Sequence, residues 1–588
     1  MNLKKRFSRV PDRLYPNFRA MFDSVCAEYG SLPAFRARAQ DGAPYTIWTY
    51  AELRRLAYSA ARWMHRRGVR PGDRVAIIAE NRPEWILAYV AGVAMGAVVV
   101  PLDSTMDAAG VLGIARASGS KVLFHSDAHA AKAKEAKATL GSLELVNFDL
   151  DAGDDGRDGL LSWEAALAQA ASAGDDDELP QAGSIDGNSP AVIIFTSGTT
   201  GVAKGIMLSH RGIIANINAA RQALVVGKDD VFIAILPLHH TYAATCTFLS
   251  PLEAGGSIVF VEKLIPTVIL RHVRDAGVTV MIGVPLLFDK IKQGVRGELA
   301  KLKGAARLVV RSLFGLSAFL SGALGMPAGR FLLGFLRRKA GLASVRLAVS
   351  GGGPLAWDTA AFYDAFGLNL VQGYGMSENG PLISVNLPEY KDNRSAGVAV
   401  KYTDVRIADP GLDGVGEIQV KSPSLMLGYL NAPDATADAF SADGWLRTGD
   451  LGYVDRRGFI FITGRSKNLI VTEGGKNVYP EEIELKFEGS PWVKEVLILG
   501  RRRSDTAAGE DVIAVCVPDF ERVAAERPDS DAASLVRDEV RRINRSLPQF
   551  MKIVDVIIRD EEFEKTSSRK VRRFMYRHYA EAGQGKRL

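Results

Sequence analysis

The sequence predicts an α/β protein with a large N-terminal domain of mixed and parallel α/β sheets, a β-rich subdomain and a small α+β C-terminal domain. Helical stretches alternate with short apolar strands between residues 45 and 150, and the rhythm resumes at residue 191, which is typical of a largely parallel sheet. The pattern becomes β-rich at 403–465, and a shorter α+β segment follows residue 467. A chain of 588 residues is too long for one compact core.

Composition and the N-terminal segment indicate a soluble protein of a reducing compartment, so we expect a cytoplasmic location. Apolar residues make up 47% and charged residues 24% of the chain, which is ordinary. The three cysteines, at 26, 246 and 516, are too far apart for a metal or disulfide pattern and are expected to be small core residues. No apolar stretch follows the basic N-terminus, so no secretory signal is expected.

Two uncharged windows are long enough to raise the question of a membrane span. Residues 85–102 are interrupted at Gly96 and become β-branched, which predicts a buried helix followed by a core strand. Residues 312–329 contain four glycines, three serines and Pro327, which argues against a spanning helix.

The strongest local signal is a glycine-rich loop at 193–210, where an apolar strand runs into a stretch of glycines and hydroxyls. Glycines let backbone N–H groups turn toward an anion, while hydroxyls and a lysine add donors and charge. The residues that combine these properties are Thr196, Ser197, Gly198, Thr199, Thr200, Gly201 and Lys204. The P-loop spacing G-x-x-x-x-G-K-[ST] does not fit here, so the loop predicts a polyphosphate site of another kind.

Two later segments also follow predicted strands. Residues 350–355 (SGGGPL) expose backbone on which a flat ring can lie. Residues 372–378 (QGYGMSE) place Tyr374 between two glycines and end on Glu378, a hard oxygen ligand suited to Mg²⁺.

Together with four further motifs, these segments resemble the signature of the adenylate-forming, AMP-binding superfamily of acyl-CoA synthetases. The further motifs are GWLRTGD at 444–450, GRSK at 464–467, GGKNVYPEEIE at 474–484 and KTSSRKVRR at 565–573. The resemblance covers nearly the whole chain and is greatest to long-chain fatty-acyl-CoA synthetases. Two positions depart from the family pattern: Ser377 stands where a threonine is commoner, and Arg569 stands where the family usually has glycine.

The resemblance implies a site for ATP and Mg²⁺. Catalytic roles fall to Lys570, Glu378 and Thr196, and Thr196 and Glu378 would hold the metal. The nucleotide would be bound by the loop residues named above and by Gly352, Gly353, Pro354, Gln372, Gly373, Tyr374, Gly375, Met376, Ser377, Asp450, Ile462 and Arg465. Arg465 can reach ribose or phosphate oxygens with its forked guanidinium.

The resemblance also implies two domains, an adenylation domain at 1–466 and a mobile lid domain at 467–588, with Lys467 at the hinge. The expected reaction joins a carboxylic acid to AMP, releases pyrophosphate, and passes the acyl group to coenzyme A. Gly474 and Gly475 would lie beside the coenzyme A arm, and Lys570 would neutralise the reacting oxygens.

The acid itself is less well defined by the sequence. LPLHH at 236–240 resembles the family segment beside the acyl pocket, so His240 and Gly283 are expected there, although a packed histidine at a strand end explains His240 about as well. Two rivals stay open: a fatty acyl-AMP ligase that loads an acyl carrier protein, and a pseudo-enzyme that binds acyl chains or nucleotide without turnover.

A segment at about 290–340 is strongly basic and apolar. It carries eleven lysines and arginines against one acid, Glu298, whereas the whole chain has a net charge of only +6. This composition suits an anionic membrane surface, and a helical insertion packed on the core with a solvated basic edge explains it equally well. Nucleic acid is not expected as a partner because interleaved aromatic residues are sparse.

Overall fold

The computed structural model describes residues 10–40, 42–151, 160–171, 179–196, 204–324, 327–474, 476–502, 509–565, 571–581 and 586–587. The chain forms two compact units. Unit 1 comprises Met1–Asp404 and Val420–Leu446, and unit 2 comprises Val405–Gln419 and Arg447–Leu588. The boundary expected at residue 466 therefore falls inside unit 2, because the strands just before it are grouped with the C-terminal residues; the role of Lys467 as a hinge stays a prediction.

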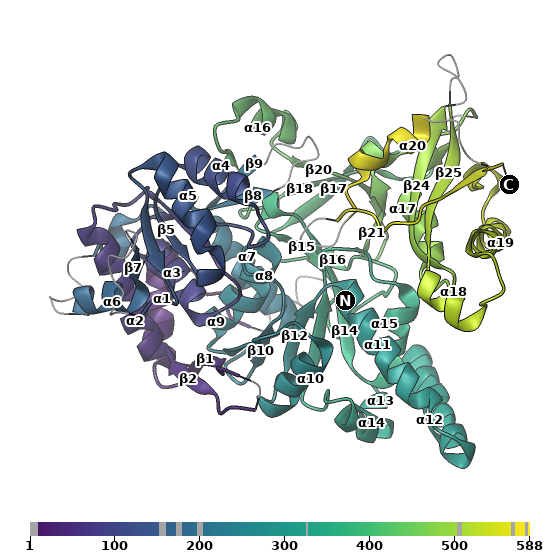
Figure 1. Cartoon of the computed structure of the whole chain (residues 1–588), viewed down its shortest axis with the longest axis horizontal. Coiled ribbons are helices and arrows are strands. Elements are labelled where there is room, and N and C mark those ends of the chain that lie inside the picture. Colours follow the sequence, from purple (N-terminus) through teal and green to yellow (C-terminus); the bar gives the residue numbers. More distant parts are fainter. Residues whose placement is uncertain are drawn as a thin grey trace. The chain divides into compact units, whose positions relative to one another are not determined.

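Unit 1 contains two large sheets (Figure 1). In sheet order, the first consists of β16 (Val398–Ala399), β15 (Leu382–Val385), β14 (Asn369–Gly375), β13 (Leu347–Ser350), β12 (Val280–Gly283), β10 (Val231–Ala234), β11 (Ser257–Phe260), β1 (Pro33–Ala37) and β2 (Thr46–Thr49). The second consists of β19 (Gly428–Tyr429), β9 (Lys204–Ser209), β8 (Pro190–Thr196), β4 (Val98–Pro101), β3 (Arg74–Ile78), β5 (Ser120–His125), β6 (Glu144–Asn147) and β7 (Leu161–Ser162). Most neighbours in both sheets are parallel, which confirms the predicted fold class.

Helices cover both faces of these sheets, so their strands are apolar on both sides, as parallel strands require. Val75 and Ile77 of β3 pack with α1–α3, whereas Ala76 and Ile78 pack with α4 and α5 on the opposite face. The helices of unit 1 are α1 (Phe18–Tyr29), α2 (Tyr50–Arg66), α3 (Pro83–Ala94), α4 (Ala108–Ser118), α5 (Ala130–Leu140), α6 (Trp163–Ala171), α7 (His210–Leu224), α8 (Thr241–Ala243), α9 (Ser250–Ala254), α10 (Pro266–Asp275), α11 (Pro285–Ala300), α12 (Gly304–Leu324), α13 (Gly329–Leu332), α14 (Gly334–Lys339), α15 (Trp357–Phe366) and α16 (Pro433–Ala439).

Local signals explain where individual helices begin. Thr49 and Glu52 form a capping box at the start of α2, which satisfies two backbone donors that have no partner within the helix. The window at 85–102 folds as predicted, into the buried helix α3 and the buried strand β4. All three cysteines are buried and free, also as predicted.

The second uncharged window, residues 312–329, forms a longer helix than its glycines and Pro327 suggested. Its helix, α12, begins at Gly304 and ends at Leu324, so Pro327 lies beyond the helix and does not interrupt it. Within the described residues, Gly304–Ala323 is the one helical stretch that is long and apolar enough to cross a membrane, and only 11% of it is buried.

Unit 2 is built around smaller sheets. One, lying mostly in unit 2, contains β17 (Asp404–Ala408), β18 (Gly416–Lys421), β20 (Leu446–Val454) and β21 (Ile460–Arg465). Another contains β24 (Val493–Arg502), β25 (Glu510–Pro518), β26 (Asp555–Ile558) and β27 (Lys586–Arg587), and β22 (Ile470–Val471) pairs with β23 (Asn477–Val478). The helices are α17 (Pro480–Glu484), α18 (Phe520–Glu526), α19 (Ala532–Asn544) and α20 (His578–Glu581).

Candidate active site

The predicted phosphate loop joins two antiparallel strands of unit 1. Thr196, the last residue of β8, lies opposite Lys204, the first residue of β9. Ser197, Gly198, Thr199, Thr200 and Gly201 lie outside the described residues. The hairpin therefore brings the hydroxyl of Thr196 and the ammonium of Lys204 to the same end of the sheet.

Tyr429 connects this hairpin to the predicted metal ligand. Its ring lies 4.9 Å from Nζ of Lys204, and its hydroxyl donates a 2.9 Å hydrogen bond to Oε1 of Glu378. Burial and the neighbouring carboxylate raise the pKa of the Tyr429 phenol well above its ordinary value, so the hydroxyl stays a donor. Sequence reasoning missed Tyr429 because only the pairing of β19 with β9 brings it here.

A second part of the site lies at the carboxyl ends of three parallel strands. Gly283 of β12 is in register with Ser350 of β13, which is in register with Gln372 of β14. Ligands of open α/β sheets bind at this edge. The predicted adenine segment, Gly352–Pro354, starts directly after β13, so the structure brings it together with Gly283 and Gln372.

Two glycines in this region are needed because other groups approach them closely. A Cβ on Gly351 would lie 2.8 Å from Cζ of Tyr242, and a Cβ on Gly375 would lie 2.1 Å from the carbonyl oxygen of Pro381. Both separations are shorter than carbon contacts allow. The backbone that Gly373, Tyr374 and Gly375 present is thus fixed by packing against β15.

The segment around Ser377 is tied to the predicted acyl segment. The hydroxyl of Ser377 lies 3.1 Å from that of Thr241, which follows His240. The hydroxyl of Tyr242 donates to the carbonyl oxygens of Gly283 and Val349, at 3.3 and 3.2 Å. The structure therefore brings the Thr241–Tyr242 segment next to Gly283 and Ser377, whereas the place of His240 beside an acyl pocket stays a prediction.

The histidine pair in this segment contains one residue that sequence reasoning passed over. His239 is buried, its ring centre lies 4.2 Å from that of His240, and its Nε2 lies 3.6 Å from Oδ1 of Asp103. Burial, reinforced by His240, lowers the pKa of His239 to about 3. The His239 ring is therefore neutral near neutral pH and packs against the ring of His240 at a tilted angle.

The donors present are suited to Mg²⁺. Glu378 supplies a carboxylate and Thr196 a hydroxyl, and the described residues include no cluster of three or more metal-binding side chains. Mg²⁺ typically keeps several waters and binds through one or two carboxylates together with substrate phosphates. Glu378 and Thr196 would hold the ion, which would supply charge neutralisation to the phosphates of a bound nucleotide.

Unit 2 carries the remaining residues predicted to bind the nucleotide that the structure describes. Asp450 of β20 lies opposite Arg465 of β21, and Nε of Arg465 is 2.8 Å from Oδ1 of Asp450. The aspartate is buried, whereas the arginine is half exposed. Ile462 is partly exposed on the same strand as Arg465. This pair offers carboxylate and guanidinium groups to a polar ligand.

The predicted hinge and acceptor residues lie further along unit 2. Lys467 is in a short 3₁₀ turn directly after β21. Gly474 is exposed in the turn between β22 and β23, with open space where a side chain would lie. Gly475 and Lys570 lie outside the described residues. The residues on either side of 566–570, Lys565 and Val571, pair as an antiparallel bridge.

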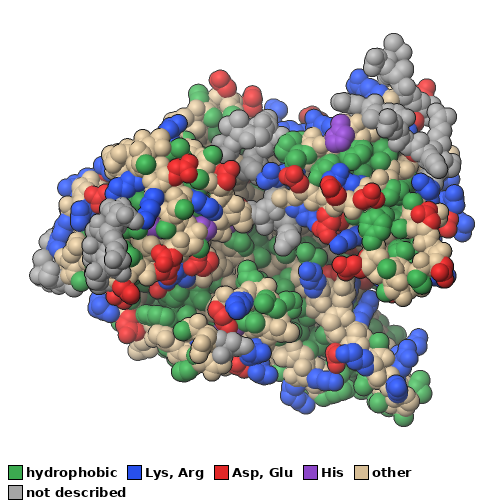
Figure 2. All heavy atoms as spheres, in the orientation of Figure 1, with side chains coloured by type: hydrophobic (Ala, Val, Ile, Leu, Met, Phe, Trp, Pro, Cys, Tyr) green, Lys and Arg blue, Asp and Glu red, His purple; other side chains and the backbone are tan. Residues whose placement is uncertain are grey.

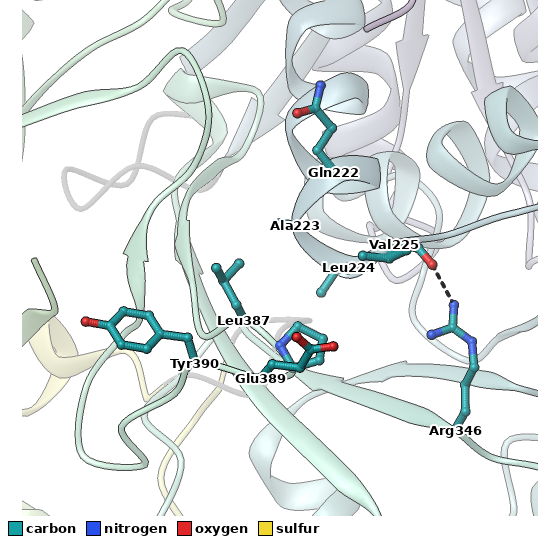
Figure 3. Close-up of a pocket in the computed structure, with 9 residues that line it drawn as sticks. Gln222, Ala223, Leu224, Val225, Arg346, Leu387, Glu389 and Tyr390 are labelled. Atoms are coloured by element: carbon teal, nitrogen blue, oxygen red, sulfur yellow. Dashed lines mark hydrogen bonds between the residues drawn. The ribbon is translucent and has the colours of Figure 1, made fainter. Parts of the chain in front are cut away.

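A cavity of about 230 Å³ in unit 1 does not coincide with this region (Figure 3). Its lining includes Val225, which precedes β10, and Arg346, which precedes β13. The Arg346 guanidinium donates a hydrogen bond to the carbonyl oxygen of Val225 at 3.0 Å. The amino ends of these strands are opposite the edge that carries Gly283 and Ser350. We assign no ligand to it.

Known proteins are similar to this chain in both sequence and fold. Residues 22–430 match the AMP-binding enzyme family, and residues 467–582 match the AMP-binding enzyme C-terminal domain. A long-chain-fatty-acid–CoA ligase, heimdall, of Drosophila melanogaster is 31% identical over 520 residues, covering 84% of this chain and 75% of its own length. A feruloyl-CoA synthase of an Amycolatopsis species is 31% identical, with 83% and 88% covered.

The crystal structure of ATP-bound MatB from Rhodopseudomonas palustris superposes with a TM-score of 0.74 at 27% identity, covering 96% of this chain and 99% of that one. Enzymes of this kind use ATP, Mg²⁺ and coenzyme A. The family match, the strand-edge site and the intact motif residues lead to one conclusion: the chain belongs to the AMP-binding enzyme family and is an adenylate-forming, AMP-producing acyl-CoA ligase.

Proposed function

We propose that the acid is a medium- or long-chain fatty acid, which is activated as its acyl-adenylate and transferred to coenzyme A. The observation that carries this proposal is that the hydroxyls of the two residues after His240, Thr241 and Tyr242, already have hydrogen-bonding partners within the protein. The hydroxyl of the half-buried Tyr242 donates hydrogen bonds to two carbonyl oxygens, and that of Thr241 is within hydrogen-bonding distance of the Ser377 hydroxyl. These hydroxyls are thus engaged within the protein, which favours an apolar acyl chain over a hydroxylated aromatic ring.

The relatives support a fatty acid without excluding an aromatic one, because a long-chain-fatty-acid ligase and a feruloyl-CoA synthase are equally similar at 31% identity. A site that hydrogen-bonds a phenol rejects substrates lacking it by orders of magnitude, whereas an apolar pocket rejects a substrate that merely adds a hydroxyl by only about a hundredfold. An enzyme with an apolar acyl pocket is therefore expected to prefer fatty acids while retaining measurable activity with aromatic acids.

The decisive experiment measures pyrophosphate release with saturated acids of increasing chain length and with ferulate and 4-coumarate, each with and without coenzyme A. We expect kcat/KM to rise with chain length and to be at least about tenfold lower for the aromatic acids. A preference for ferulate would overturn the fatty-acid assignment. Adenylate that accumulates in the presence of coenzyme A would instead favour a ligase that loads a carrier protein, and no response to any acid would favour a pseudo-enzyme.

A further inference from the structure

Helix α12 has an exposed apolar face that nothing in the described structure covers. One face packs on α15: Val310 and Ser317 are buried, the Ser317 hydroxyl donates to the carbonyl oxygen of Ala365 at 2.6 Å, and Phe314 stacks on Phe362 and Phe366. The opposite face exposes Leu308 (68%), Val309 (57%), Leu316 (48%) and Phe319 (65%). In Figure 1, α12 extends away from the other elements of unit 1.

The four exposed residues form one stripe with a basic border. At 3.6 residues per turn, Leu308, Phe319, Leu316 and Val309 fall within an arc of about 100°, and Arg311 and Arg307 follow on one side of it. This is the arrangement of a helix that lies in a membrane interface, with apolar residues inward and cations at the headgroups.

The short helices α13 and α14 continue the same character. Phe331 is 83% exposed and Phe335 is 45% exposed, next to Arg330, Arg338 and Lys339. Contacts of α13 with both α12 and α15 keep these helices beside α12. We call the exposed residues of α12, α13 and α14 the α12–α14 surface. Figure 2 shows hydrophobic side chains interspersed with lysine and arginine in this part of the molecule.

The structure corrects the charge count that the sequence suggested. Lys292 and Arg337 are buried: Lys292 pairs with Asp289 and Asp358, and Arg337 donates to the carbonyl oxygens of Gly367, Leu342 and Val345. These two cations are engaged inside the protein and are therefore not available to an external ligand. Glu298 pairs with Lys301 at 2.5 Å and lies 3.9 Å from Lys339.

Four exposed arginines remain available to a ligand. Within the described part of the chain, no carboxylate forms an ion pair with Arg307, Arg311, Arg330 or Arg338. These arginines have no acidic partners and lie beside exposed apolar side chains. The two features together are complementary to a partner whose outer layer is anionic and whose interior is apolar.

We propose that the α12–α14 surface docks the enzyme peripherally on an anionic lipid bilayer. The apolar stripe enters the acyl boundary, and the arginines contact lipid phosphates. Although α12 is long enough to span a bilayer, spanning would require its buried Val310–Phe314–Ser317 face to leave α15. A second copy of the chain is a poorer occupant because two such surfaces would bring arginines together. The inference concerns docking and holds whichever acid is activated.

Vesicle flotation of the full-length enzyme tests the proposal. Vesicles of phosphatidylcholine with phosphatidylglycerol are compared with phosphatidylcholine alone, at about 0.1 M and about 1 M salt, where the screening length falls from about 10 to about 3 Å. We expect binding to the anionic vesicles at low salt and a large loss at high salt. Arg307→Gln with Arg311→Gln should weaken it on the order of tenfold, and Leu308→Ser with Phe319→Ser should weaken it at least as much.

Matched controls use exposed residues elsewhere in unit 1. Lys228→Gln with Lys263→Gln removes two exposed cations, and Ile47→Ser with Leu264→Ser removes two exposed apolar side chains; both pairs should bind like wild type. Adenylate formation with a water-soluble acid should be unchanged in all variants. The proposal is overturned if wild type ignores anionic vesicles, if the control pairs weaken binding equally, or if the α12 variants alter only a monomer–dimer equilibrium measured by sedimentation.

Discussion

Several motif residues of unit 1 are held tightly by packing, whereas Arg465 and Gly474 of unit 2 are exposed. In unit 1, Gly351 and Gly375 have no room for a single carbon atom, and the acid Glu378 is bonded to Tyr429. In unit 2, Arg465 is half exposed, and a Cβ on Gly474 would have no described atom within 4 Å apart from its chain neighbours. The difference indicates that packing fixes the backbone of the predicted nucleotide-binding segments in unit 1, whereas packing does not lock the Arg465 guanidinium and the Gly474 turn of unit 2 in place.

The largest effect should come from the charge that unit 2 contributes. Lys570→Ala should lower acyl-adenylate formation by about a thousandfold, since an ammonium about 4 Å from an anionic oxygen is worth roughly 4 kcal/mol at an effective dielectric of about 20. Thioester formation from supplied acyl-adenylate should change only a few-fold. The two half-reactions are measured separately, with the neighbouring exposed cation as control in Arg572→Ala; equal loss of both would remove Lys570 from its assigned role.

A matched pair of glycine substitutions addresses the comparison directly. Gly351→Ala should destabilise unit 1 by about 1–3 kcal/mol because the methyl group meets the Tyr242 ring, and it should raise the KM for ATP at least about tenfold. Gly474→Ala, where the space is open, should leave the free energy of unfolding within about 0.5 kcal/mol. Urea unfolding measures both; similar destabilisation by the two would contradict the contrast between the units.

Breaking the ion pair of unit 2 should impair function more than stability. Asp450→Asn keeps the shape but removes the charge that faces Arg465. We expect a loss of about tenfold or more in kcat/KM for ATP, from a lost hydrogen bond to a charged group. The melting temperature should barely move, because the arginine is half exposed and such pairs contribute about 0–1 kcal/mol. Arg457→Gln, which breaks an exposed pair with Asp455, serves as the control.

A smaller effect should follow from Tyr429→Phe in unit 1. The ring near Lys204 remains, and only the hydrogen bond to Glu378 is lost. A net cost of about 0.5–1.5 kcal/mol corresponds to a few-fold to about tenfold rise in the Mg·ATP requirement. Titration of activity against Mg²⁺ checks this, and Tyr390→Phe is the matched control. An unchanged requirement would show that Tyr429 does not position Glu378.

The smallest effect is the contribution of His210 to the pH dependence of stability, and it disappears at neutral pH. His210 begins α7 in the core, its Nδ1 accepts from the backbone N–H of Phe18, and burial lowers its pKa from 6.5 to about 4. As the pH falls, His210 is therefore protonated in the unfolded chain before it is protonated in the folded protein. Its contribution to the free energy of unfolding is fully present above about pH 6.5 and is lost as the pH drops toward 4. His210→Asn, which keeps an acceptor, should flatten the melting temperature across this range by a few degrees. A slope identical to that of wild type would rule out His210 as its source.

Much of the fold could be predicted because periodicity and motif order are local properties. The alternation of helices and apolar strands gave the parallel sheets, and the β8–β9 hairpin lies where the glycine-rich stretch was found. Tyr429 could not be predicted, because its place beside Lys204 and Glu378 depends on a strand pairing across the chain. The grouping of β20 and β21 with the C-terminal residues in unit 2 also could not be predicted, because it depends on tertiary contacts.

The sequence by itself determined the family, the chemistry of the site and the basic, apolar character of residues 290–340. Only the tertiary structure decided which of those charges are available: it buries Lys292 and Arg337 as packing partners and leaves Arg307, Arg311 and the apolar stripe of α12 exposed. The physical reason is that composition fixes the charges of a segment, whereas the face that a helix turns toward its neighbours fixes which charges reach the solvent.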